Sequence, residues 1–132
     1  MKKDRLEKRG QEKHGAPFER SPCPIASSLD ILGDKWTLVL VRDLVTGKRR
    51  YGEFLDSPEG IATNILATRL KAMVDAGLIA KRPYQRNPTR HEYTLTPLGD
   101  DLLPVLQAFC RWGNRHFPES WIPPAWFMAP RP

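Results

Sequence analysis

The side chains best suited to chemistry lie in a periodic segment that begins near Ile61 and ends at Gly77. Advancing by about 100° per residue, as in an α-helix, places Asn64, Thr68 and Lys71 in one polar stripe opposite an apolar face. Asparagine can pair with adenine, threonine can contact the thymine methyl group, and lysine can reach guanine or phosphate. The wet face of an ordinary surface helix has the same pattern, so the stripe alone leaves both interpretations open.

The neighbouring elements must position this helix. A short segment, Tyr51–Leu55, and a turn at Pro58–Gly60 precede it, which is the order of a helix-turn-helix motif. Two strands are expected afterwards, over Leu78–Tyr84 and Arg90–Thr96, with turn residues at 85–89 between them. A hairpin that carries arginines and follows a recognition helix indicates a wing, because such arginines suit phosphates or a narrow minor groove.

Basic residues also precede the helix pair, where Lys48, Arg49 and Arg50 could clamp the DNA backbone. Asp75 argues mildly the other way, because a carboxylate repels phosphate and would have to lie outside the groove. The candidate DNA-binding residues are Arg50, Tyr51, Thr63, Asn64, Thr68, Arg69, Lys71, Arg86 and Arg90.

The N-terminal half of the core is expected to be helical. Cys23 and Pro24 are typical of a helix start, and Gly33 ends that segment. The apolar run Leu38–Val45, stopped by Gly47, predicts a buried central helix, with a strand as the competing interpretation.

The C-terminal half should hold one more helix, which Thr96 and Pro97 open and which runs to about Phe117 with a kink at Pro104. The last fifteen residues contain five of the thirteen prolines and several aromatic residues. We expect this tail to contain no regular helix and to lie extended on the domain or on a partner subunit. The predicted organisation is a flexible basic arm (1–20), a folded domain (21–117) and a Pro/aromatic tail (118–132).

The composition sets weaker limits. The 132 residues carry a net charge of +6, which favours a polyanionic partner. Half of this excess lies in residues 1–20, however, and a tail without a role explains that segment equally well. Two cysteines cannot form a disulfide scaffold, so we expect a cytoplasmic protein. No apolar run approaches a membrane span, and no secretory signal is recognisable.

Enzymatic functions find no support in the sequence. His14, His91 and His116 are far apart and lack metal-ligand spacing with a cysteine. We recognise no glycine-rich phosphate loop and no nucleophile elbow. We therefore expect no catalytic site, no metal and no cofactor.

Four segments together resemble the HxlR-type family of bacterial winged helix-turn-helix regulators. The matching residues are CPIASSLDILGDKWTLVLVRDL, RRYGEF, EGIATNILATRLKAMVDAGLI and HEYTLTPLGDDLLPVLQAFCRWG, which cover roughly residues 22–117. The chain departs from the family at Ala62, where a serine helix cap is common, and at His91, where a small apolar residue is commoner. The start of the recognition helix is therefore open, with Thr63 or Asn64 as alternative caps.

The resemblance implies a mainly α fold with a small β-hairpin: a winged helix-turn-helix domain with extra N- and C-terminal dimerisation helices. It further implies a homodimeric transcription regulator that binds double-stranded DNA, so that the dimer reads a pseudo-palindromic operator. We expect repression where the operator overlaps a promoter, with activation as the open alternative. The residues implied in the subunit interface are Leu29, Leu32, Leu106, Phe109 and Trp112.

Two alternatives remain beside DNA binding alone. Cys23 lies at a predicted helix N-terminus, where the helix dipole favours a thiolate, so it is a candidate sensor of oxidants or electrophiles such as quinones. A small buried cap is the plainer interpretation of Cys23, and Cys110 is expected to be inert packing. The second alternative is a winged-helix module that binds protein instead of DNA.

Overall fold

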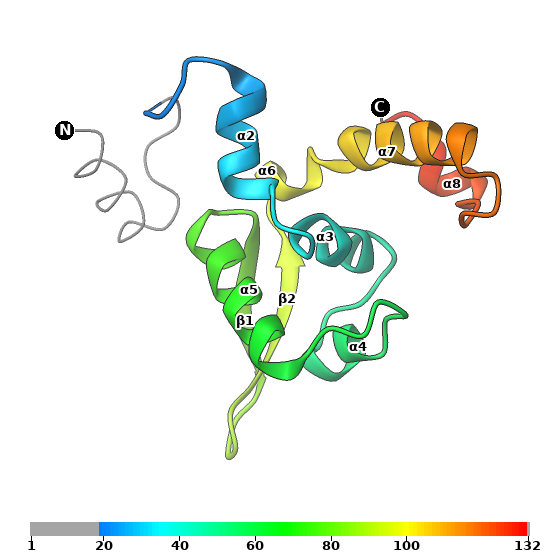
Figure 1. The fold of residues 1–132 in the computed structure, drawn as a ribbon. Helices are drawn as coiled ribbons and strands as arrows, with labels where there is room; N and C mark the ends of the chain where they lie inside the picture. The colour runs from blue at the N-terminus through cyan, green and yellow to red at the C-terminus, as the bar shows by residue number, and fades with distance from the viewer. Residues whose placement is uncertain (1–18, 132) are drawn as a thin grey trace.

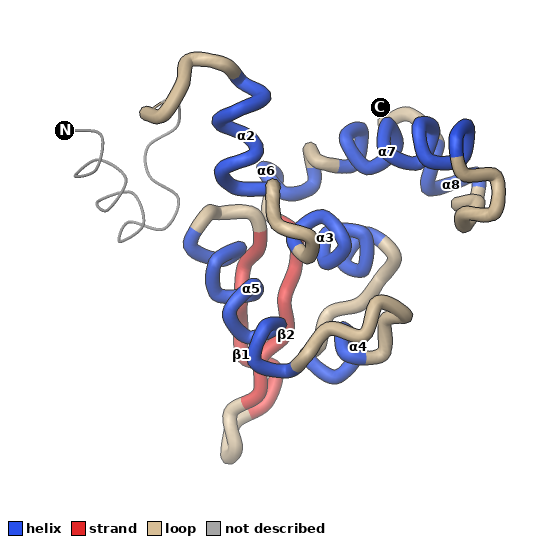
Figure 2. Tube along the Cα trace, viewed as in Figure 1, coloured by secondary structure: helices blue, strands red, loops and turns tan. Residues whose placement is uncertain are grey.

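The computed structural model describes residues 19–131, and it is a helical fold with one two-stranded hairpin (Figures 1 and 2). The predicted fold class is therefore confirmed. The predicted arm lies outside the described residues except for its last two. In order, the elements are α2 (Pro24–Leu32), α3 (Thr37–Val45), α4 (Tyr51–Leu55), α5 (Thr63–Asp75), β1 (Ile79–Gln85), β2 (Arg90–Leu95), α6 (Pro97–Asp100), α7 (Leu103–His116) and α8 (Ala125–Met128). Within residues 19–131, no helix has the length and apolar character needed to cross a membrane.

Helix α3 is the centre of the fold, as its apolar sequence predicts. Leu40, Val41 and Leu44 are almost completely buried, and α3 contacts both β2 and α7. The strand interpretation of this run is therefore wrong. Gly47 ends the segment with φ 111°, a left-handed conformation that favours glycine. The helix begins at Thr37, and Asp34 lies three residues before it. The Asp34 carboxylate accepts hydrogen bonds from the backbone N–H groups of Trp36 and Thr37, both at 2.9 Å.

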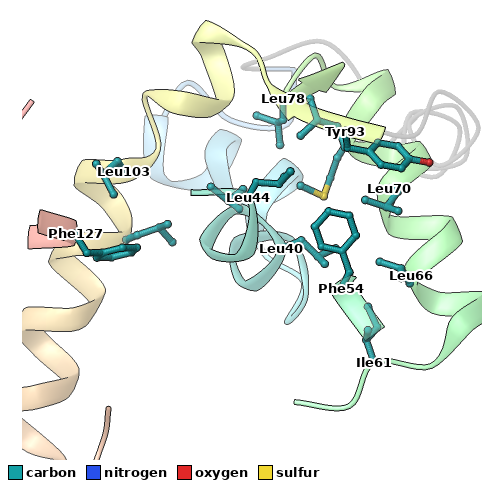
Figure 3. Close-up of a cluster of buried hydrophobic side chains, with 14 residues drawn as sticks. Leu40, Leu44, Phe54, Ile61, Leu66, Leu70, Leu78, Tyr93, Leu103 and Phe127 are labelled. Atoms are coloured by element: carbon teal, nitrogen blue, oxygen red, sulfur yellow. The ribbon is translucent and has the colours of Figure 1, made fainter. Parts of the chain in front are cut away.

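The core packs α4, α5 and the hairpin against α3 (Figure 3). Phe54 of α4 is fully buried and meets the Tyr93 ring of β2 edge-on, with ring centroids 6.3 Å apart. Leu66 and Leu70 present the apolar face of α5 to the same cluster. The core thus fixes the orientation of α5 about its own axis and leaves its polar stripe outside.

The two ends of the molecule differ in character (Figure 1). Helix α5 begins at the end where the hairpin tip projects, at the bottom of the view, and it packs beside β1. Helices α2 and α7 lie at the opposite end, at the top. The first half of α5 and the hairpin tip are therefore well separated from α7, whereas the second half of α5 lies beside Ile31 at the end of α2.

The predicted single C-terminal helix is wrong, because two helices occupy that segment. Thr96 caps α6, and its hydroxyl accepts a hydrogen bond from the Gly99 N–H at 3.2 Å. The chain turns at Asp101 and Leu102, and α7 starts at Leu103 with Pro104 in its first turn. Proline has no N–H to donate and clashes with the preceding turn of a continuing helix, so Pro104 starts a new helix instead of kinking an old one.

The C-terminal segment folds back on α7. We expected its prolines to exclude a helix, and that prediction is wrong, because the segment contains the short helix α8. Pro124 immediately precedes the four-residue helix α8, where a missing N–H costs nothing. Phe127 of α8 is 1% exposed. The buried Gln107 of α7 donates from Nε2 to the carbonyl oxygens of Phe127, at 2.8 Å, and Ala129, at 2.9 Å. This amide thereby holds the returning chain by its backbone.

Candidate nucleic-acid interface

The polar stripe of α5 is exposed as the periodicity predicts. Asn64, Thr68 and Lys71 all face solvent. The Thr68 hydroxyl donates to the Asn64 carbonyl oxygen at 3.0 Å, and Lys71 lies 3.3 Å from Asp75 one turn later. Exposed pairs of this kind contribute little free energy, so Lys71 can exchange its partner at small cost.

The first turn of α5 is held from outside the helix. The helix starts at Thr63 with Ala62 as its N-cap, so neither alternative cap from the sequence is used. Alanine has no side-chain acceptor for the first backbone N–H groups, which are a favourable surface for an anion. The Tyr51 hydroxyl donates to the Thr63 carbonyl oxygen. This bond ties α4 to the N-terminus of α5 and commits the only proton of the phenol.

Arg69 is placed differently from the other candidates. It is half-buried, and its Nη1 lies 3.4 Å from Asp34 Oδ1, at the start of α3. This position is on the flank of α5, off the exposed stripe. The structure therefore assigns Arg69 a role in anchoring α5 to α3.

The hairpin has the form of a wing, with β1 and β2 antiparallel and Ile79 opposite Leu95. The register shifts between Pro83 and Gln85, which is a bulge close to the tip. Arg86 and Arg90 flank this tip and are exposed, and among residues 19–131 neither has an ion-pair partner.

Two of the three basic residues before α4 form hydrogen bonds within the domain. The Lys48 ammonium donates to Ser57 Oγ at 2.7 Å. The Arg49 guanidinium donates to the carbonyl oxygens of Leu44, in the last turn of α3, and Lys48, at 2.8 and 2.9 Å. Acceptors of the same chain thus hold both cations, and their contact with the DNA backbone stays a prediction.

Arg50 differs because it stays exposed. Its guanidinium lies over the Tyr84 ring of β1, 3.7 Å from the centroid. A guanidinium stacked through its face still has N–H donors at its edge. Tyr84, which sequence reasoning missed, thus joins the start of α4 to the wing.

A partly buried polar network that the sequence did not predict joins α3 to the turn before α5, with Asp43 and Ser57 buried and Glu59 exposed. Asp43 Oδ1 accepts from Arg42, and its Oδ2 accepts from the Ser57 hydroxyl at 2.6 Å. Arg42 also forms two hydrogen bonds with Glu59, at 2.7 and 2.8 Å. A lone carboxylate inside the apolar run of α3 was the available signal, because a buried charge requires partners.

At the opposite end, α2, α3 and α7 enclose a mostly apolar groove of about 940 Å³. Leu29 and Phe109 line it with exposed fractions of 56% and 61%. Leu32 also lines it but is half-buried, and Leu106 is buried in its own subunit at 7%, so it offers a partner little surface. Trp112 is 60% exposed beside the groove, against the rings of His116 and Phe117.

The two cysteines have contrasting surroundings. Cys23 is exposed at the N-terminus of α2, so its interpretation as a buried cap is wrong. Hydrogen bonds from the backbone N–H groups of Ala26 and Ile25 lower the pKa of its thiol. Burial raises the pKa of the half-buried Cys110 thiol. In the described part of the chain, no cluster of three or more His, Cys, Asp or Glu side chains could hold a metal ion.

Comparison with known sequences agrees with this architecture. A family model described as HxlR-like helix-turn-helix matches residues 31–121. The uncharacterized HTH-type transcriptional regulator Rv3095 of Mycobacterium tuberculosis is 36% identical over 100 residues, which are 76% of this chain and 63% of that protein. The match to sll1512 of Synechocystis, named in the same way, is 38% over 92 residues, 70% of this chain and 68% of that protein. The chain therefore spans less than two thirds of Rv3095.

Solved structures agree as well. PA1607, a candidate transcription factor, is 37% identical with a TM-score of 0.71 over 82% of this chain and 76% of its own. The redox regulator HypR in its reduced form is 31% identical, with a TM-score of 0.65 over 75% of this chain and all of its own. The reduced transcriptional regulator YodB of B. subtilis is 26% identical, with a TM-score of 0.62 over 75% of this chain and 98% of its own. These relatives are transcription regulators and not enzymes. Given the helix pair, the hairpin and the match over residues 31–121, the chain belongs to the HxlR-like helix-turn-helix family.

Proposed function

We propose that this chain is a cytoplasmic, sequence-specific DNA-binding regulator that acts as a homodimer and represses transcription where its operator overlaps a promoter. The observation that carries the proposal is the shared end of α5 and the wing (Figure 1). There, the exposed stripe of α5 and the arginines of the wing tip, which have no ion-pair partner in the described chain, form one surface.

The contacts divide by chemistry. Asn64 and Thr68 are the base-reading residues, because they lie on the exposed stripe in the first half of α5. Thr63 and Lys71 flank them and reach the edges of the major groove. Arg50, Arg86 and Arg90 supply phosphate or minor-groove contacts beside it, and Tyr51 acts by orienting α5.

A second copy of the chain is the proposed occupant of the apolar groove. Leu29, Phe109 and Trp112 are each more than half exposed, and such a patch marks an interaction surface. A two-fold axis at this end leaves both copies of α5 free. Two identical recognition helices then require half-sites separated by about one helical turn of DNA, or a multiple of it.

Selection of bound duplexes from random DNA by the full-length protein tests the proposal. We expect an enriched pseudo-palindrome, and an affinity that falls with salt at a slope of about −0.9 per phosphate contact. Failure to enrich any sequence, together with a flat salt dependence, would favour the winged-helix module that binds protein.

Matched arginine variants localise the surface. Arg86→Ala removes a wing cation, and Arg111→Ala removes an exposed cation from α7, away from the wing. We expect the first to weaken DNA binding and reduce the salt slope by about one, and the second to leave both unchanged. Equal effects would mean that net charge, and not the wing, determines affinity.

A second candidate function is electrophile sensing through Cys23, which its exposure and lowered pKa favour. HypR is named as a redox regulator, and its reduced and oxidised forms are both similar to this chain. Addition of the Cys23 thiolate to a quinone would form a carbon–sulfur bond, and the ring would take up a proton to give a hydroquinone thioether. We expect Cys23→Ser to abolish the effect of quinone on DNA binding and Cys110→Ser to preserve it; the reverse result would refute sensing at Cys23.

A further inference from the structure

The turn between α4 and α5 is fastened to α3 on both sides of Pro58. On one side, the buried Ser57 hydroxyl donates to Asp43 at 2.6 Å and accepts from Lys48 at 2.7 Å. On the other side, both oxygens of Glu59 accept from Arg42. A turn residue held by its side chain four positions before a helix constrains where that helix can begin.

Arg42 is the central member of this arrangement. Its guanidinium donates to Glu59 from Nη1 and Nη2, and to Asp43 from Nε and Nη2. Two carboxylates therefore accept hydrogen bonds from one planar group. The Arg42 bond is the largest influence that lowers the pKa of Glu59. Lysine carries the same charge but has no planar fork, so it cannot reproduce this geometry.

We propose that Arg42 and Glu59 are positioning residues that set the placement of α5 for reading DNA. The proposal rests on the proposed DNA-binding function and goes beyond its contact residues. Arg42 lies on α3, and Glu59 precedes Thr63 by only one short turn that contains Gly60 with φ 67°. Glycine gives that turn conformational freedom, so the Arg42–Glu59 pair restrains a segment that would otherwise move.

The pair also lies between two surfaces. Arg42 lines the groove of α2, α3 and α7, and Glu59 leads into α5. The proposed subunit interface and the proposed DNA-reading helix therefore share one side-chain contact.

Glu59→Gln gives a test in which two explanations predict opposite signs. If Glu59 acted only through its charge, its neutralisation would remove a repulsion from phosphate and strengthen binding to every duplex. A positioning role predicts binding weakened about tenfold to the selected duplex, comparable to the loss of one base contact. Binding to a scrambled duplex of the same composition should change by less than about twofold.

Arg42→Lys supplies the second variant, with thermal unfolding to confirm that each protein is folded. Keeping the charge while losing the paired hydrogen bonds should weaken operator binding as Glu59→Gln does. Asp100→Asn is the matched control, because it removes the charge and one of the two hydrogen bonds of Asp100 with Arg131, at 2.9 and 3.0 Å, in a pair that does not touch the start of α5. We expect no change in operator binding for the control.

Hydrogen exchange gives a readout that does not depend on DNA. Amides of residues 60–66 should exchange faster in both variants, while those of α3 and of the hairpin should be unchanged. Unchanged exchange at 60–66, or operator affinity equal to that of the unaltered protein, would overturn the proposal. Absence of any selected duplex together with faster exchange would instead count against the proposed function alone.

Discussion

Replacing Phe127 by alanine tests whether the C-terminal segment belongs to the fold. The side chain is 1% exposed, and its ring meets Trp121 and Trp126 edge-on at centroid distances of 6.0 and 5.8 Å. Figure 3 shows it beside Leu103 at one end of the buried cluster, apart from Phe54 and Leu66.

The magnitude follows from burial and from the place of the residue in the chain. Phenylalanine-to-alanine changes in a core cost about 3–5 kcal/mol in free energy of unfolding. Phe127 lies near the chain end, so the segment can undock without global unfolding, which limits the measurable loss. We therefore expect Phe127→Ala to lower the free energy of unfolding by about 3 kcal/mol, or by the full docking free energy of the segment if that is smaller.

Urea unfolding at fixed protein concentration is the assay, because the stability of a dimer depends on concentration. A chain that ends at residue 117 measures the docking free energy directly and sets the upper bound. Trp126→Ala is the control, since that side chain is 58% exposed and should cost less than about 1 kcal/mol. A Phe127→Ala protein as stable as the Trp126→Ala protein would refute the reasoning and return residues 118–132 to a separate tail.

Three further predictions concern pH, salt and assembly. Burial raises the pKa of Asp34, but hydrogen bonds from the Thr37 hydroxyl and backbone N–H groups outweigh it, so the folded-state pKa lies below the usual value. The charged carboxylate stabilises the fold above about pH 4, and this stabilisation is lost as the pH falls through the folded-state pKa. Asp34→Ala should therefore lower the free energy of unfolding by about 1 kcal/mol at pH 7. It should also flatten the acid limb of the stability curve, measured by denaturant titration at a series of pH values. Arg90→Ala should reduce the salt slope of DNA binding by about one, as measured by fluorescence anisotropy, whereas an unchanged slope would remove Arg90 from the phosphate contacts. Phe109→Lys should shift the protein from dimer to monomer in sedimentation, and a persistent dimer would exclude the groove as the interface.

The elements were predictable where the signal is local. Pro24 and Gly33 bound α2 as predicted, and the periodicity of residues 61–77 predicts both α5 and the side that faces the core. Such signals need only neighbours within a turn or two. The break between α6 and α7 was missed because a proline is compatible with either a kink or a new helix start, and packing decides between them.

The sequence by itself determined the helix pair, the hairpin and the residues on the polar stripe, because amphipathic spacing and turn residues act over short distances. The tertiary structure decided which cations remain free. Arg69 is held by Asp34, and Lys48 by Ser57, whereas Arg86 stays exposed at the wing tip. A cation is most available to DNA where tertiary packing brings no acceptor to it, and that packing depends on contacts between different elements of the fold.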